Sequence, residues 1–279
     1  MYRCVSYIAI VLMVFLAGNV HPAFAEKEKF GPHQMLATGE NINFAILGPK
    51  PAKPAPTLFI FALDADRTLN SETYRQAGNF LAQRGYLCVS IDLPCHGSQR
   101  RKGEAAEIKG WRQRIDAGEN VMEEFTQRAT KVLDYLIEEQ YADPDKVAAC
   151  GTSRGGFSAC HFAMADPRIK CVAAYIPVAD LRSISEFNGA ETSLLLENIS
   201  LIRNADKLAG RGVWISIGDR DLRVDTDRAV EFSRALSKSA ANDPSRNIEL
   251  RVSSIEGHNT PPDAARESAY WIDRTLTKK

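Results

Sequence analysis

Short apolar segments recur along the chain from residue 57 onward, and polar or amphipathic stretches separate them. Apolar runs without alternation are typical of strands that other elements cover on both faces, as in a parallel sheet. The predicted strands are residues 57–63, 86–92, 147–150, 171–177, 213–218 and 248–254. Residues 42–47 form a further short apolar segment, which we expect to be an edge strand.

Segments with helical periodicity lie between the predicted strands. The predicted helices are residues 71–85, residues 119–141, a helix directly after Ser153, residues 226–239, and a last helix from residue 261 onward. Strands that alternate with helices predict an α/β fold, with a mostly parallel sheet of about eight strands and helices on both faces. Residues 178–212 interrupt this alternation, but the segment is only about 35 residues long, so we expect a small or absent lid.

The segment 98–118 is polar and rich in Lys and Arg around Trp111. One interpretation is a solvated loop above the functional site, since charged side chains usually stay in water. The other is a wall that selects an anionic or aromatic substrate. We expect the solvated loop.

The first 25 residues have a different pattern from the rest of the chain. Arg3 precedes an apolar run at residues 8–17, and Ala-Phe-Ala at residues 23–25 gives the small-x-small pattern of a cleavage site. This predicts a signal peptide at residues 1–25 and a single domain at residues 26–279, in the periplasm or outside the cell. A permanent anchor is the alternative, although the apolar run is short for a membrane span.

Charge and cysteine content narrow the possible partners. The 279 residues include 35 basic and 35 acidic side chains and no basic block, which argues against a nucleic-acid partner. Five cysteines remain if Cys4 leaves with the signal peptide, namely Cys88, Cys95, Cys150, Cys160 and Cys171. An odd number leaves at least one unpaired within the chain; Cys160 with Cys171 is one candidate disulfide, and the connectivity among the five cysteines stays open. Without Cys-x-x-Cys pairs or a His/Cys cluster, we expect no metal.

The chemical centre of the sequence is Gly-Thr-Ser-Arg-Gly-Gly at residues 151–156. It follows a predicted strand and precedes a predicted helix, so it reads as a sharp turn with Ser153 at its apex. The glycines two positions before and after the serine allow strand and helix to approach closely. Ser153 at a helix N-terminus is a candidate nucleophile, because the helix dipole there favours a negatively charged intermediate.

An acid and a histidine follow the serine in the order that such an enzyme requires. Asp219, Asp221 and Asp225 come just after the predicted strand 213–218, and His258 comes just after the strand 248–254. We expect Asp221 to be the acid, with Asp219 and Asp225 as alternatives. His96 precedes the serine and is the weaker candidate for the base.

Four motifs together make the chain similar to the α/β-hydrolases, and most similar to the dienelactone-hydrolase-like and prolyl-oligopeptidase-like esterases and peptidases. They are Asp-Leu-Pro-Cys-His-Gly at residues 92–97, the serine motif at residues 151–156, Gly-x-x-Asp-x-x-Val at residues 218–224, and Gly-His at residues 257–258. The resemblance implies a Ser153, His258, Asp221 triad without a cofactor, and a structural role for the turn at residues 92–97.

The resemblance also implies an oxyanion hole of two backbone N–H groups. One is that of Arg154, after the nucleophile, and its side chain is expected to form an ion pair. The other comes from the loop after strand 57–63, where the family usually has His-Gly and this chain has Leu63 and Asp64, so the donor is Asp64 or Ala65.

These features predict a secreted serine hydrolase that cleaves carboxylic esters through an acyl-serine. A prolyl-oligopeptidase-like peptidase is the main alternative, and a non-catalytic binding protein of the same fold is the second. The expected partner is a small ester or a short peptide, with no membrane span in the mature chain.

Overall fold

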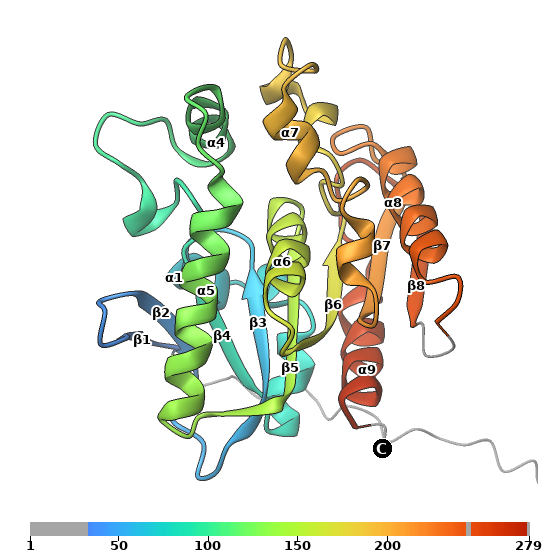
Figure 1. Ribbon diagram of the computed structural model, residues 1–279. Helices are drawn as coiled ribbons and strands as arrows, with labels where there is room; N and C mark the ends of the chain where they lie inside the picture. Colours follow the sequence, from blue (N-terminus) through green and yellow to red (C-terminus); the bar gives the residue numbers. More distant parts are fainter. Residues whose placement is uncertain (1–32, 244–246, 278–279) are drawn as a thin grey trace, which may run out of the picture.

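The computed structural model describes residues 33–243 and 247–277, so the predicted signal peptide at residues 1–25 lies outside the described residues. An eight-stranded sheet in the order β1-β2-β4-β3-β5-β6-β7-β8 forms its centre (Figure 1). The strands are β1 (His33–Ala37), β2 (Asn43–Leu47), β3 (Ala55–Phe61), β4 (Leu87–Ile91), β5 (Ala142–Thr152), β6 (Ile169–Tyr175), β7 (Gly212–Arg220) and β8 (Ile248–Glu256). β2 pairs antiparallel with β1 and with β4, and the remaining pairs are parallel. The predicted α/β fold class is confirmed.

The strand expected at the edge, residues 42–47, is the second strand of the sheet. β1 forms the edge instead, with Met35 opposite Ala45 of β2. We did not predict β1 from the sequence, because three of its five residues are exposed and its only apolar run, Met35 to Ala37, is short.

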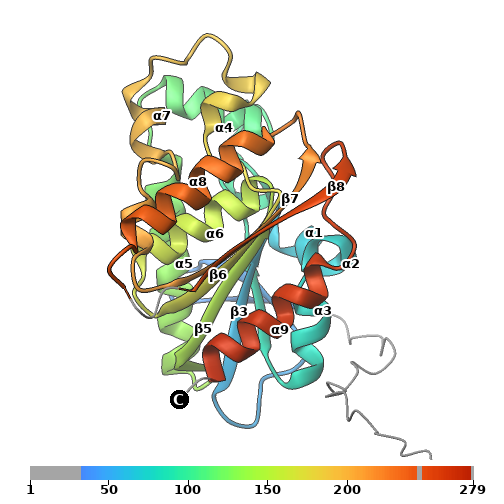
Figure 2. The same cartoon turned by 90° about the vertical axis from the view of Figure 1, so that its right-hand side faces the viewer.

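Helices cover both faces of the sheet (Figure 2). One face carries α1 (Ala65–Asn70), α2 (Glu72–Arg75), α3 (Gly78–Leu81) and α9 (Ala264–Thr277). The other face carries α5 (Val121–Glu138), α6 (Arg154–Ala165) and α8 (Thr226–Ser239). Beyond the carboxyl ends of the parallel strands stand α4 (Glu107–Asp116) and α7 (Leu194–Ile199), which Figure 1 shows at the top. The segment 178–212 holds only α7 and short 3₁₀ turns, so it forms a small cap, as expected.

The helix predicted at residues 71–85 is broken in the middle. Gln76 separates α2 from α3 with φ 48° and ψ −120°, a conformation that no helix contains. After the break, α3 packs tightly on the sheet, since a Cβ added to Gly78 would lie 2.5 Å from Ile60 Cδ1.

The prediction of a solvated loop at residues 98–118 is wrong. The segment contains the ten-residue helix α4, and Trp111 is fully buried, with Nε1 donating to the carbonyl of Pro94 at 2.6 Å. Arg114 is also buried, because its guanidinium pairs with Glu104 at 2.6 Å. Trp111 is therefore part of the core and does not form a substrate wall.

Aromatic packing fixes the helix that follows the predicted nucleophile. Phe162 of α6 packs edge-to-face on Phe59 of β3 with ring centroids 5.1 Å apart, and Phe61 packs in the same way on Phe125 of α5. Such pairs add to the burial of large apolar rings, so α6 is held firmly against the centre of the sheet.

Candidate active site

Ser153 lies at the turn between β5 and α6. Its backbone has φ 56° and ψ −116°, and its N–H donates to the carbonyl of Tyr175 at 2.8 Å. A Cβ on Gly151 would lie 2.2 Å from the carbonyl oxygen of Gly155, and one on Gly155 would lie 1.9 Å from that of Phe61. Both positions thus require glycine, which is the structural reason for Gly-x-Ser-x-Gly here.

Asp221 follows β7 and is the acid that the structure brings to the histidine. It is 1% exposed, and its Oδ1 accepts from the N–H groups of Arg223 and Val224 at 3.0 and 3.2 Å. Its Oδ2 lies 2.8 Å from Nδ1 of His258. Burial alone would raise the pKa of this carboxyl, but the hydrogen bond and charge of His258 and the two amides together hold the pKa below its ordinary value.

The two alternative acids, Asp219 and Asp225, bind other partners. Asp219 pairs with Arg220 at 3.5 Å, and Asp225 caps α8 by accepting from the N–H of Asp227 at 3.0 Å. Neither carboxylate is the partner of His258, so the choice of Asp221 agrees with the geometry.

His258 lies in the loop after β8 and joins the other two residues. Its Nε2 is 3.0 Å from Oγ of Ser153, on the ring side opposite the nitrogen that faces Asp221. The loop is attached to the acid loop, since the N–H of Gly257 donates to the carbonyl of Arg220 at 3.2 Å. The result is a continuous chain of hydroxyl, imidazole and carboxylate. With Nδ1–H donated to Asp221, Nε2 is free to accept the serine proton.

The three backbone N–H groups expected as oxyanion donors differ in their hydrogen bonds. The N–H of Arg154 lies in the first turn of α6, where helical N–H groups have no intrahelical acceptor. The N–H of Ala65 donates to Oδ1 of Asp92 at 2.8 Å, so it is already engaged. Asp64 remains as the other candidate donor, and its side chain is turned to cap α1 through the N–H of Arg67 at 2.8 Å.

The side chain of Arg154 forms the expected ion pair. Its Nη2 lies 2.9 Å from Oε2 of Glu107, the first residue of α4, and its Nε donates to the carbonyl of Ala62 at 3.3 Å. The contact with Ala62 places Arg154 next to the loop that carries Asp64. The sequence analysis did not identify Glu107, because contacts between residues so distant along the chain leave no periodic signal.

The turn at residues 92–97 is structural, as the resemblance implied. Asp92 accepts from the N–H of Ser98 at 2.8 Å in addition to its bond with Ala65. His96 is 3% exposed, and its Nδ1 lies 2.8 Å from the carbonyl of Pro94. Burial lowers the pKa of His96 to about 4, so its ring is neutral at physiological pH.

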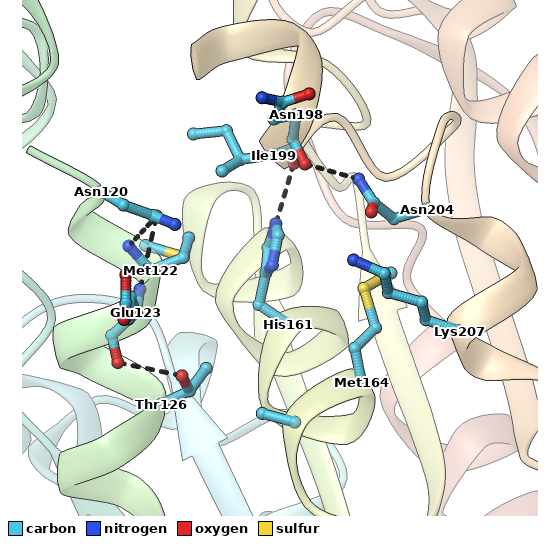
Figure 3. Close-up of a pocket in the computed structure, with 11 residues that line it drawn as sticks. Asn120, Met122, Glu123, Thr126, His161, Met164, Asn198, Ile199, Asn204 and Lys207 are labelled. Carbon is cyan, nitrogen blue, oxygen red and sulfur yellow. Dashed lines mark hydrogen bonds between the residues drawn. The ribbon is translucent and has the colours of Figure 1, made fainter. Parts of the chain in front are cut away.

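A separate cavity of about 210 Å³ lies between α5, α6 and the segment around α7 (Figure 3). His161 stands at its centre, with Nε2 2.9 Å from the carbonyl of Ile199. Ser153, Asp221 and His258 are not among the residues that line it. Within residues 33–243 and 247–277, no group of three side chains is arranged to hold a metal ion, and no helix is long and apolar enough to cross a membrane.

The sequence model of the prolyl oligopeptidase family matches residues 72–279. No curated protein gave a significant match.

Among solved structures, dipeptidyl peptidase 4 of Porphyromonas gingivalis is similar with a TM-score of 0.63 and 17% identity over 88% of this chain, but this covers only 36% of the peptidase. Acylaminoacyl peptidase of Pyrococcus horikoshii has a TM-score of 0.64 and 13% identity over 90% of this chain and 42% of its own. Acetyl xylan esterase 1 of Thermoanaerobacterium sp. JW/SL YS485 has a TM-score of 0.60 and 16% identity over 88% of this chain and 83% of its own. At these identities the likeness is one of fold.

Proposed function

The chain belongs to the prolyl oligopeptidase family and is a serine hydrolase, and on this basis we propose that Ser153 is its nucleophile, His258 its general base and Asp221 the acid that orients His258. The observation that carries the proposal is the pair of contacts made by the His258 ring, 3.0 Å to Ser153 and 2.8 Å to Asp221. Both lie within the range expected of a nucleophile, base and orienting acid.

In the first half of the reaction, Nε2 of His258 takes the proton from Oγ of Ser153 while Oγ attacks the substrate carbonyl. The carbonyl oxygen becomes negatively charged and is stabilised by the N–H groups of Arg154 and Asp64. The tetrahedral intermediate collapses, and His258 gives its proton to the leaving group. In the second half, water replaces the serine as nucleophile, and the same transfers release the acid and restore Ser153.

We propose a carboxylic ester as the substrate. The supporting observation is the fold shared with the Thermoanaerobacterium acetyl xylan esterase, along 83% of that enzyme's chain. A short peptide is the second candidate, favoured by the match to the family of prolyl oligopeptidase.

The test begins with a fluorophosphonate probe, which labels an activated serine. We expect wild-type protein to take one label, Ser153→Ala to take none, and Ser254→Ala, a change at an exposed serine, to label like wild type. A folded wild-type protein that takes no label would mean that the chain is a binding protein of this fold.

The choice of substrate is tested with p-nitrophenyl acetate and butyrate against aminoacyl and peptidyl arylamides. We expect kcat/KM to be higher for the esters, with Ser153→Ala inactive on all of them. Amide turnover without any ester preference would instead support a peptidase.

We also propose that the protein is exported, on the basis of the signal-peptide pattern in residues 1–25. The check is N-terminal sequencing of the protein recovered from the periplasm or the medium. We expect the sequence to begin at Glu26.

A further inference from the structure

Gln76 has the same unusual backbone conformation as the predicted nucleophile. Its φ of 48° and ψ of −120° nearly equal the 56° and −116° of Ser153. This region is unfavourable for any residue with a Cβ, and such residues concentrate at functional sites. The chain nonetheless has glutamine at this position, where glycine would adopt the conformation without strain.

The side chain of Gln76 connects the two loops that carry the nucleophile and the base. Its Nε2 donates to Oγ1 of Thr152 at 3.1 Å and to Oγ1 of Thr260 at 3.2 Å. An amide nitrogen has two hydrogens, so both of its donor positions are used. Thr152 directly precedes Ser153, and Thr260 follows His258 by two residues.

The backbone around Gln76 is held by the strand that also holds Ser153. The N–H of Ala77 donates to the hydroxyl of Tyr175 at 3.3 Å, and the carbonyl of Tyr175 accepts from Ser153 at 2.8 Å. The hydroxyl of Tyr175 also lies 2.5 Å from Oγ of Ser268 in α9. Across the break, Arg75 donates to Asn79 at 2.8 Å. The strained residue is thus fixed on both sides. Gln76 as a whole is only 4% exposed.

The position of His258 in the sheet explains why such a connection is useful. β8, which leads to His258, is the edge strand opposite β1. β6 and β7 separate it from β5, which leads to Ser153. The loop after β8 is partly exposed, and the side chain of His258 is 27% exposed. Within that loop, Thr260 is the residue that the Gln76 amide ties directly to the nucleophile turn.

We propose that Gln76 is a positioning residue: its amide fixes the loop of His258 to the nucleophile turn and keeps Nε2 of His258 within hydrogen-bond reach of Ser153. The inference rests on the triad proposed above. It assigns a role in catalysis to a residue whose side-chain amide donates hydrogen bonds to neighbours of Ser153 and His258 along the chain.

The experiment removes the amide and its acceptor separately. Gln76→Gly keeps the backbone conformation without strain and deletes the amide, whereas Thr260→Val keeps the shape of the threonine and deletes the acceptor. Thr260→Ser retains a hydroxyl and serves as the conservative rescue. Gln140→Ala is the matched control, because Gln140 also has a positive φ, 60°, but lies exposed after α5.

We measure kcat per active site, counted by fluorophosphonate titration, and KM on p-nitrophenyl acetate. Gln76→Gly and Thr260→Val should each lower kcat about 10- to 100-fold, because small misplacements of a reacting group are costly. KM should change by less than about threefold, since ground-state binding is not affected. Thr260→Ser and Gln140→Ala should behave like wild type.

The double variant Gln76→Gly/Thr260→Val should lose no more activity than the worse single variant, because both changes break one connection. Wild-type kcat per titrated site in both single variants would overturn the proposal, as would fully multiplicative losses in the double variant. If wild-type protein takes no fluorophosphonate, the triad proposal fails instead, so the two failures are distinguishable.

Discussion

The carboxylate of Asp221 stays charged although it is buried. The carboxylate is almost completely buried, which by itself favours the neutral acid. Two amides of its own loop and the Nδ1–H of His258 compensate for the lost water. The contact with His258 also fixes its tautomer. Because a carboxylate can only accept a hydrogen bond, the ring proton lies on Nδ1, and Nε2 remains the acceptor for the serine proton.

Replacing Asp221 by Asn should therefore reduce catalysis without unfolding the protein. An amide can donate to Nδ1, which would place the ring proton on Nε2 and block proton transfer from Ser153. We expect kcat to fall about 10⁴-fold on p-nitrophenyl acetate, the loss known for this change in a serine protease triad.

The alternative acids provide the controls for this substitution. Asp219→Asn and Asp225→Asn carry the same chemical change at residues with other partners, and asparagine retains the capping ability of Asp225. Both should keep kcat near that of wild type. A large loss in either, with little loss in Asp221→Asn, would reassign the acid.

At the scale of elements, the sequence predicted those whose signals are local. The Ser153 turn, the strand ends that carry Asp221 and His258, and α8 were all predictable, because each depends on a short motif or on simple periodicity. The break at Gln76 was not, because residues 71–85 show the pattern of one amphipathic helix, and the contacts of Gln76 with Thr152 and Thr260 come from residues far away in the sequence.

α4 was missed for a different reason. Its buried residues Ile108, Trp111 and Ile115 have helical spacing, but the fourth member of this face is Arg114, which counts as polar in any sequence pattern. The guanidinium can be buried, at 3% exposure, because Glu104, itself 9% exposed, pairs with it and the carbonyl of Gln99 accepts a hydrogen bond from it. A polar residue made suitable for the interior by a distant partner cannot be recognised from hydrophobicity.

The Glu104 and Arg114 pair gives a prediction at this scale. Glu104→Gln removes the buried counter-charge of Arg114 and leaves only the half-exposed Glu124, 3.5 Å away, so we expect the free energy of unfolding to drop by about 3 kcal/mol at neutral pH. Glu231→Gln is the matched control, because Glu231 pairs with Arg228 on the surface, and its loss should cost less than about 1 kcal/mol. Urea denaturation followed by fluorescence measures both.

The difference in the free energy of unfolding between wild type and Glu104→Gln should depend on pH, because it depends on the charge of Glu104. The hydrogen bond from Arg114 lowers the pKa of Glu104 from 4.5 to about 2 in the folded protein. A lowered folded-state pKa means that the stabilisation is complete above the unfolded value of 4.5 and is lost as the pH falls towards 2. The gap between wild type and Glu104→Gln should therefore narrow below pH 4.5. A gap that does not change with pH would contradict the ion-pair explanation.

At the scale of the whole molecule, the parallel sheet brings distant parts of the chain to one edge. Ser153, Asp221 and His258 follow β5, β7 and β8, whose carboxyl ends point in the same direction. The core beneath that edge holds the five described cysteines, Cys88, Cys95, Cys150, Cys160 and Cys171, all of which are unpaired and buried. The candidate disulfide between Cys160 and Cys171 is absent from this structure.

These thiols should be inert in the folded protein, even in an oxidising compartment. Burial raises the pKa of Cys88, Cys95 and Cys160 to about 12, and it raises those of Cys150 and Cys171 as well. Because only the thiolate reacts, neither oxidation nor alkylation should proceed without unfolding. We expect no maleimide labelling of the chain lacking residues 1–25 under native conditions, and five labels after denaturation in guanidinium chloride.

Ser254→Cys supplies the positive control, because residue 254 is exposed on β8 and a cysteine there should label at once in the folded protein. The five buried thiols come from β4, the turn after it, β5, α6 and β6, so they share one core. In moderate denaturant they should consequently become reactive together, at the rate of global unfolding. A single cysteine that labels fully in native protein would show that its part of the core opens independently. A native disulfide between Cys160 and Cys171, detected by mass spectrometry, would contradict the free thiols.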